Sequence, residues 1–302
     1  MSQSDIINSR QIQWFPGHMT KTLRLMEKEI RNVDCVLQIL DARIPLSSLN
    51  PEIERITAGK PHLYILNKAD LADPEITKQW LAYFKSAGAG CLAMDSKQRG
   101  RATAAKGPIE KELSALMARR RNRGMVGAAV RVMVVGIPNV GKSTFINQVA
   151  GRKSAKAENR PGVTRGKQWV TVERGLELLD TPGILWPKFE DPEVGLKLSY
   201  TGAVKDDVVD IETLAMHLME LLATYDPTAL EQRYKITLPE HAQGLELLEL
   251  CGRKRGMLIS GGEIDIERMS RVLLEEYRSG KLGRFTLEMP EKAEEQDHGE
   301  EG

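Results

Sequence analysis

Two short motifs, each directly after an apolar run, constrain the fold of this chain more than any other feature. One, at residues 136–143, follows the run at 130–135, and the other, at residues 67–70, follows the run at 63–66. Short apolar runs of this kind are typical of buried parallel strands, and ligands of such sheets bind where the strands end. The sequence therefore predicts an α/β fold with a mostly parallel, doubly wound sheet and a ligand site at one sheet edge.

The segment at residues 136–143, GIPNVGKS, fits the G-x-x-x-x-G-K-[ST] phosphate-loop pattern at every required position. A helix is expected to follow it, so that backbone N–H groups and the helix N-terminus face the anion. Lys142 is expected to reach the β- and γ-phosphates, and the Ser143 hydroxyl to ligate Mg²⁺. A glycine-rich turn without a ligand is the alternative, which the flanking strand and helix disfavour. The nucleotide-binding residues expected here are Asn139, Val140, Gly141, Lys142, Ser143 and Thr144.

The segment at residues 67–70, NKAD, is expected to read a guanine base. Asp70 can accept hydrogen bonds from guanine N1–H and from the 2-amino group. Adenine offers neither, so it would leave a desolvated carboxylate unpaired. Asn67 is expected to hold the loop and the purine edge, and the Lys68 stem to lie along the base. Four such residues also suit an ordinary turn, but together with a phosphate loop they indicate GTP and GDP as ligands.

The order of the two motifs is unusual, because the guanine segment precedes the phosphate loop. In an ordinary GTPase the phosphate loop comes first, so two intact motifs in reverse order indicate a circularly permuted P-loop GTPase fold. Residues 180–183, DTPG, supply the Asp-x-x-Gly switch. Asp180 is expected to bind Mg²⁺ through water, and the Gly183 amide to touch the γ-phosphate.

Two further nucleotide contacts are predicted from weaker patterns. Ser96 and Lys97 resemble the Ser-Ala-Lys loop that contacts guanine O6, although a plain solvated turn fits them about equally well. Thr164, in a Pro-Gly loop, is expected to ligate Mg²⁺ only when GTP is bound. Thr171 is the rival by position, but it lies in a strand-like run. We favour Thr164, because a flexible loop can close over phosphate and a strand cannot.

The sequence does not show which group orients the attacking water. Ras-like enzymes place a glutamine directly after the switch glycine, whereas this chain has Ile184, so slow intrinsic hydrolysis is expected. His18 is one candidate for positioning water, and a structural histidine in an N-terminal turn is the equal alternative. Help from another side chain, a cation or a partner stays open. The catalytic set predicted on this basis is His18, Lys142, Thr164 and Gly183.

The permuted order, together with residues 14–19 (WFPGHM) and 41–46 (DARIPL), resembles the YlqF/RbgA family of ribosome biogenesis GTPases. The resemblance runs from about residue 13 to about residue 284. It implies an assembly factor for the large ribosomal subunit, with GTP hydrolysis stimulated by the ribosome and coupled to release. Asn139 is similar to the asparagine of potassium-stimulated GTPases, which implies a K⁺ ion there. The DAR segment has no assigned chemical step, and a strand-ending salt bridge also explains it.

A second function stays open beside this one. The chain fits a GTP-binding checkpoint, or a signalling protein that acts on a protein effector, with incidental hydrolysis. Charge bears on the choice, because residues 97–123 hold nine basic and two acidic residues. Such a segment suits a solvated linker as well as an RNA-binding patch. The family resemblance favours the RNA-binding patch, with rRNA and ribosomal proteins of the large subunit as partners.

The rest of the chain predicts a second, smaller unit. Amphipathic patterns at residues 211–222, 242–251 and 263–279 predict a small all-helical C-terminal domain. We expect a GTPase domain at 1–194, a helical domain contacting RNA or the ribosome at 195–285, and an acidic, disordered tail at 286–302. No apolar run is long enough to span a bilayer, and three scattered cysteines without an export signal favour the cytoplasm. A monomer is expected.

Overall fold

The computed structural model describes residues 17–95, 129–151, 168–173 and 176–290, together with residues 111, 114 and 118. Six strands form one sheet in the order β3-β2-β1-β4-β6-β5, in which only β5 runs antiparallel to its neighbour. The strands are β1 (Cys35–Asp41), β2 (His62–Asn67), β3 (Gly90–Ala93), β4 (Val130–Val135), β5 (Gln168–Glu173) and β6 (Leu176–Asp180). The mostly parallel sheet predicted from the sequence is therefore confirmed.

The spatial order of the strands differs from their order along the chain. The strand β4, which leads into the phosphate loop, lies at the centre between β1 and β6, and β2 with the guanine segment lies one strand further out. In the pairing between β1 and β4, Cys35 stands opposite Val132 and Gln38 opposite Val135. The carboxyl ends of β1, β2, β4 and β6 consequently meet at one edge, as the permuted arrangement requires.

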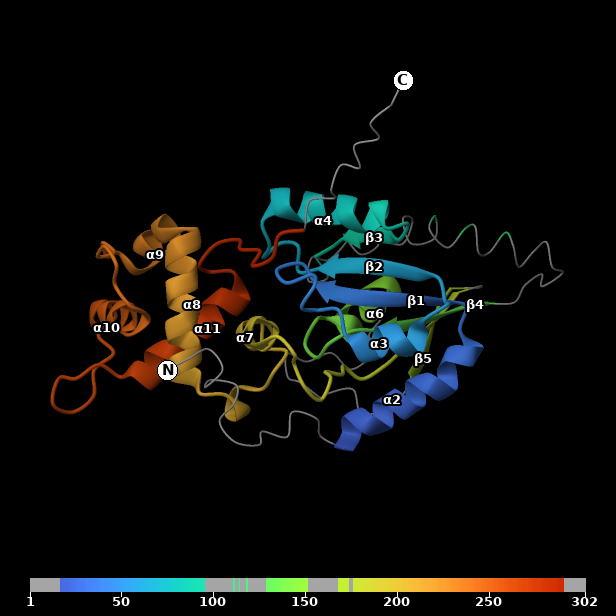
Figure 1. The fold of residues 1–302 in the computed structure, drawn as a ribbon, viewed down its shortest axis with the longest axis horizontal. Helices are drawn as coiled ribbons and strands as arrows, with labels where there is room; N and C mark the ends of the chain where they lie inside the picture. The colour runs from blue at the N-terminus through green and yellow to red at the C-terminus, as the bar shows by residue number, and fades with distance from the viewer. Residues whose placement is uncertain are drawn as a thin grey trace, which may run out of the picture.

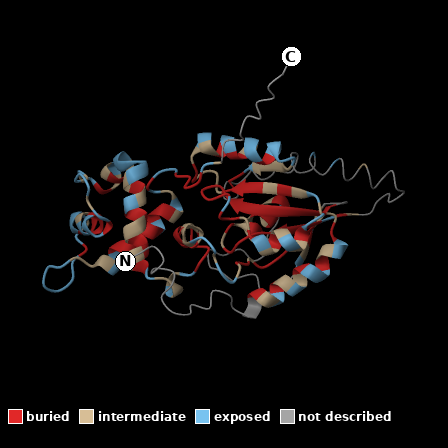
Figure 2. Ribbon diagram, in the orientation of Figure 1, coloured by how far each residue is buried: buried red, intermediate tan, exposed pale blue. Residues whose placement is uncertain are grey.

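The sheet is covered on both faces, and alternate residues of its strands face different layers. Leu40 and Leu66 pack with Trp80 and Phe84 of α4 (Pro74–Ser86), whereas Ile39 and Ile65 belong to the larger core on the other face. Every residue of β1 is buried. Figure 2 shows the result, with a buried sheet and outer helices that expose one side. The other helices beside the sheet are α2 (Gly17–Glu29), η1 (Ile30–Asn32), α3 (Pro51–Thr57) and α6 (Lys142–Val149).

The C-terminal part of the described chain is helical, as predicted. It contains α7 (Pro192–Tyr200), η2 (Asp206–Val208), α8 (Ile211–Tyr225), α9 (Pro227–Tyr234), α10 (Gly244–Lys254) and α11 (Ile266–Ser279). In Figure 1, α7 lies between the sheet and the helices packed around α8. Aspartate side chains cap the N-termini of α7, α8, α9 and α11, which explains where these helices begin. Within the described ranges, no helix is long and apolar enough to cross a membrane.

One buried glutamate joins three of these helices. The Glu276 carboxylate, on α11, accepts hydrogen bonds from Arg233 and Tyr234 of α9 and from Arg255 beyond α10. Burial alone would raise the pKa of Glu276, but the hydrogen bonds and the two guanidinium groups lower it below its ordinary value. The cluster therefore links α9, the end of α10 and α11 through buried polar contacts.

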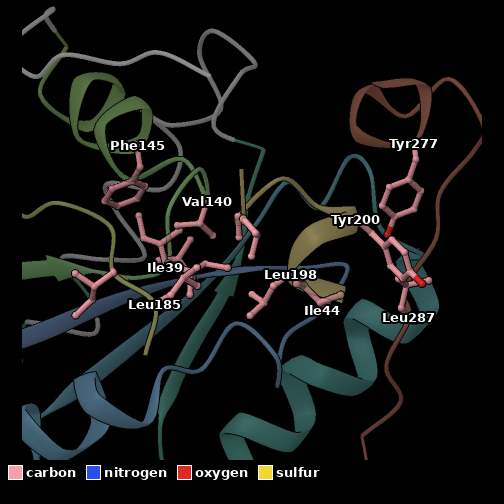
Figure 3. Packing of buried hydrophobic residues seen from close by; sticks show 14 of the residues in the cluster. Ile39, Ile44, Val140, Phe145, Leu185, Leu198, Tyr200, Tyr277 and Leu287 are labelled. Carbon is pink, nitrogen blue, oxygen red and sulfur yellow. The ribbon is translucent and has the colours of Figure 1, made fainter. Parts of the chain in front are cut away.

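The hydrophobic core is continuous between the sheet and the helical part. A single cluster of buried residues contains Ile39 of β1, Phe145 of α6, Leu198 of α7 and Tyr277 of α11. Figure 3 shows these side chains in one packed series that also includes Leu287. Because interiors are close-packed, a shift of α7 or α11 must be accommodated by the residues beneath the phosphate loop.

The segment after α11 returns to the sheet, and we call residues 283–289 the strap. The Phe285 N–H donates to the Leu71 carbonyl (3.1 Å) and the Leu287 N–H to the Arg43 carbonyl (2.8 Å). The Trp80 indole donates to the Glu288 carbonyl at 3.0 Å. Because Thr286, Leu287 and Glu288 are buried, the expected start of a disordered tail at residue 286 is too early; residues 291–302 lie outside the described part.

Candidate active site

The phosphate loop requires backbone conformations that depend on glycine and asparagine. Gly136 and Gly141 have φ values of +148° and +101°, and Asn139 lies in the left-handed region at +59°. A Cβ on Gly136 would lie 2.4 Å from the Ile39 carbonyl oxygen. The loop therefore passes so close to β1 that only glycine fits, and it ends at the first residue of α6.

Lys142 is buried inside this loop. Its ammonium group donates to the carbonyls of Ile137 (2.8 Å) and Gly136 (3.2 Å). Burial lowers the pKa of Lys142 to about 8, although the nearby Asp180 carboxylate works in the opposite direction. A desolvated lysine beside glycine-rich backbone can bind phosphate oxygens strongly, because their charge replaces the lost hydration.

Ser143 and Asp180 form the part of the site that suits a divalent cation. The Ser143 hydroxyl lies 2.9 Å from Asp180 Oδ2. Asp180 Oδ1 is buried and has no hydrogen-bond partner among the residues that the structure describes. Burial raises the pKa of Asp180, against the opposing effects of Ser143 and Lys142. A hydroxyl and an under-satisfied carboxylate are oxygen ligands of the kind that Mg²⁺ takes, so the residues fit the ion, whose charge would shield phosphate oxygens.

The switch segment lies directly against the phosphate loop. A Cβ on Gly183 would lie 2.7 Å from the Pro138 nitrogen and 2.8 Å from the Lys142 ammonium nitrogen. The absence of a side chain therefore allows the Gly183 backbone to reach the place where phosphates would bind. The geometry brings the two motifs together, and the predicted contact of the Gly183 amide with the γ-phosphate stays a prediction.

The guanine segment is tied to the phosphate loop by a buried hydrogen bond. The Asn67 side-chain amide donates to the Val140 carbonyl at 2.7 Å. A Cβ on Gly141 would lie 2.3 Å from the same amide nitrogen, so Gly141 is needed for this approach. Two motifs separated by about seventy residues are thus joined directly, and the spacing between them is fixed by this contact.

Comparison with known proteins agrees with this arrangement. Residues 131–240 match the protein family described as 50S ribosome-binding GTPase, a match that contains the phosphate loop and the switch but not the guanine segment. Ribosome biogenesis GTPase A of Bacillus cereus is 44% identical over 291 residues, which cover 94% of this chain and 96% of the relative. The chain belongs to the ribosome biogenesis GTPase A family.

Solved structures of the same family support this assignment. GDP-bound TM YlqF is 28% identical, with a TM-score of 0.66, and the likeness covers 89% of this chain and all of the other. GNP-bound YlqF from T. maritima is also 28% identical, with a TM-score of 0.63 over 90% of this chain and 99% of the other. As a member of this family, the chain is a GTPase with a P-loop GTPase domain and a helical C-terminal region.

Ile184 occupies the position where Ras-like GTPases place the water-orienting glutamine. Its side chain is fully buried in the core, and its carbonyl accepts a hydrogen bond from the Asn50 amide at 2.9 Å. The Asn50 side-chain oxygen Oδ1 also caps α3, since Glu52 N–H donates to it at 2.9 Å. Asn50 therefore holds the backbone just after the switch. Sequence reasoning missed this residue, since nothing local links it to a partner 134 positions away.

Asn139 has a second role that the sequence did not reveal. Its side-chain N–H donates to the Gly202 carbonyl at 3.3 Å, at the end of α7. The preceding carbonyls of Ser199 and Tyr200 accept hydrogen bonds from Arg278 of α11, which also forms an ion pair with Asp206. Because a carbonyl can accept only from the amide nitrogen, this contact leaves the Asn139 oxygen as the atom available to a cation.

Several predicted site residues cannot be placed. Ser96, Lys97 and Thr164 lie outside the described residues, as does most of the basic segment at 97–123. His18 lies in the first turn of α2, but its side chain is outside the described part. Thr171 lies in β5 opposite Glu177 of β6, so this rival of Thr164 is a strand residue. Thr144 is half-buried in the first turn of α6, and Val140 is buried.

Proposed function

We propose that this GTPase is an assembly factor for the large ribosomal subunit, whose contact stimulates hydrolysis and is followed by release. One observation carries the proposal. The chain matches a GTPase named for ribosome biogenesis over nearly the full length of both proteins, while its two nucleotide motifs join through the Asn67–Val140 contact. The family description, 50S ribosome-binding GTPase, supports the large subunit as the partner.

In this proposal each motif has a distinct task. Asp70 reads guanine, with Asn67 and Lys68 holding the base loop and Ser96 and Lys97 contacting guanine O6. Lys142 and the backbone of the phosphate loop bind the phosphates, and the Gly183 amide contacts the γ-phosphate. The Mg²⁺ ligands proposed are Ser143, Asp180 through water, and Thr164 when GTP is bound.

The step that needs assistance is activation of water. Ile184 is buried and cannot orient it, so turnover by the protein alone is expected to be slow. We assign this task to His18 or to a group of the ribosome, and we assign K⁺ to the Asn139 oxygen. A cation there would stabilise charge that develops on the phosphates, as an arginine finger does.

The test is GTP hydrolysis in potassium buffer with purified large or small ribosomal subunits. Strong acceleration by the large subunit alone is expected, and replacing K⁺ by Na⁺ should reduce it. Equal acceleration by both subunits would contradict the large subunit as the specific partner. Acceleration by neither would remove the ribosomal partner and leave a GTPase that acts on a protein effector.

The variant Asp70→Asn supplies a matched control for this experiment. Xanthine carries a 2-oxo group where guanine carries the 2-amino group, so an asparagine amide can donate where the aspartate accepted. The variant should lose ribosome-stimulated GTP hydrolysis and gain ribosome-stimulated hydrolysis of xanthosine triphosphate. Recovery with this nucleotide would show that the lost activity came from the base contact and not from misfolding.

A further inference from the structure

The DAR segment at the end of β1 contains a buried carboxylate, Asp41, which contacts two cations. One is Arg43 of the same segment, and the other is Lys68 of the guanine segment. Arg43 donates to Asp41 through Nε (2.9 Å to Oδ1) and through Nη2 (2.9 Å to Oδ2). The Lys68 ammonium lies 3.0 Å from Asp41 Oδ2. The side chains of Asp41 and Arg43 are each 1% exposed, so this cluster is part of the interior. Burial alone would raise the pKa of Asp41, yet the two cations hold it well below its ordinary value.

Lys68 connects this cluster to base recognition. It stands between Asn67 and Asp70, and its backbone lies in the left-handed region with φ of +60°. A side chain disfavours this conformation, so surrounding contacts must hold it. The contacts that hold it include the Asp41 ion pair and the Leu71 N–H, which donates to the Lys68 carbonyl at 2.9 Å. Asp41 therefore contributes to holding the guanine-reading loop, together with the Asn67–Val140 and Ala69–Met94 hydrogen bonds.

Arg43 connects the same cluster to the C-terminal helices. Its guanidinium carbon lies 5.1 Å from the centre of the Tyr277 ring of α11. A planar guanidinium over an aromatic face is a favourable cation–π arrangement, and desolvation strengthens it. The Tyr277 hydroxyl is buried and has no hydrogen-bond partner among the described residues. The polar contact of Tyr277 with the cluster is therefore made by its ring face, over which Arg43 lies. The strap adds to this, because Leu287 N–H donates to the Arg43 carbonyl.

We propose that Asp41, Arg43 and Tyr277 are positioning residues for guanine specificity, through which α11 holds the base-reading loop in place. Tyr277 holds Arg43, Arg43 holds Asp41, and Asp41 holds Lys68, which sets the backbone that presents Asp70. The C-terminal part therefore contributes to base discrimination without touching the nucleotide. This inference rests on the proposed reading of guanine by Asp70, but it does not depend on the ribosomal partner.

The experiment compares the dissociation constants of GDP and IDP in each variant. Hypoxanthine lacks the 2-amino group, so IDP loses one of the two donors to Asp70 while its phosphates bind as those of GDP do. The ratio of the two constants therefore measures base recognition, and phosphate binding cancels. In the unmodified protein IDP should bind at least about tenfold more weakly than GDP, as for the loss of a hydrogen bond to a charged group. A ratio near one would contradict the role of Asp70 itself.

Tyr277→Leu removes the ring and should lower the IDP-to-GDP ratio about threefold, mostly through weaker GDP binding. Tyr277→Phe keeps the ring and loses only an unpartnered hydroxyl, so it should retain the full ratio. Asp41→Asn, which is nearly isosteric, should lower the ratio further, because both cations lose their counter-ion. Arg43→Lys, which keeps the charge but loses the two-point contact, serves if either of these variants does not fold.

Arg271→Ala is the control on the same helix, since the Arg271 side chain is 57% exposed and, among the described residues, forms its salt bridge with Glu267. It should leave both dissociation constants unchanged. If Tyr277→Leu and Asp41→Asn weaken GDP and IDP by the same factor, the cluster supports the fold as a whole and the proposal is wrong. The proposal is supported if the IDP-to-GDP ratio is lowered in Tyr277→Leu and in Asp41→Asn but retained in Tyr277→Phe.

Discussion

The strap offers a direct test of how the C-terminal end stabilises the GTPase domain. Ending the chain after Gly283 removes all of the strap except that glycine, whereas ending the chain after Pro290 removes only residues 291–302 and serves as the control. Phe285 and Leu287 are 6% and 5% exposed, and their burial contributes about 2 kcal/mol each. Four hydrogen bonds stabilise the strap, namely the three described above and the one from Asp73 N–H to the Thr286 hydroxyl. With the Glu288 carboxylate, which accepts from Leu46 N–H, they add about 1 kcal/mol each, roughly 5 in all. Ordering about six residues costs roughly 1 kcal/mol each.

The expected net loss is therefore about 3 kcal/mol of unfolding free energy, with lower GDP affinity because Leu71 beside the guanine segment loses its partner. Urea unfolding followed by tryptophan fluorescence measures it, since the fully buried Trp80 donates to the Glu288 carbonyl and reports the strap. Equal unfolding free energies for the two shortened chains would refute this reasoning, and would mean that the strap only rests on the surface.

Three further outcomes follow from the site. Burial lowers the pKa of Lys142 to about 8 from an ordinary 10.5, so Lys142 binds more protons in the unfolded chain between these values and its own contribution to stability rises with pH there. In urea titrations of nucleotide-free protein, the unfolding free energy of the unmodified protein should therefore rise relative to that of Lys142→Met over this pH range. Gly141→Ala places a methyl against the Asn67 amide and should weaken GDP binding at least about tenfold, measured with a fluorescent analogue. Ile184→Gln buries an unpaired amide and should cost about 2–3 kcal/mol in thermal unfolding without raising intrinsic GTP hydrolysis.

The features that could be predicted from the sequence are those with local signals. The phosphate loop and the guanine segment each consist of consecutive residues between a strand and the next element, so pattern alone places Lys142 and Asn67 at one sheet edge. The helical C-terminal part was equally accessible, because amphipathic periodicity extends over whole helices. The roles assigned to Thr164, His18, Ser96 and Lys97 stay predictions.

The features that the sequence did not predict depend on partners far apart in the chain. Asn50 and Ile184, or Arg43 and Tyr277, have no local pattern that links them, and only the folded topology brings them together. The strap did carry a weak signal. Phe285 and Leu287 alternate with Thr286 and Glu288, as strand-like segments do, but the acidic residues that follow obscured it.

The central pairing of β1 with β4 has a consequence for synthesis of the chain. Translation delivers β1, β2 and β3 first, and the strand that pairs with the other edge of β1 begins only at Val130. Until then a strand that is fully buried in the folded protein has one unpaired edge, which is the kind of surface that invites aggregation. Strand β1 must wait for its second partner while roughly ninety further residues are made, so we expect slow, late folding and a need for protection as the chain leaves the ribosome.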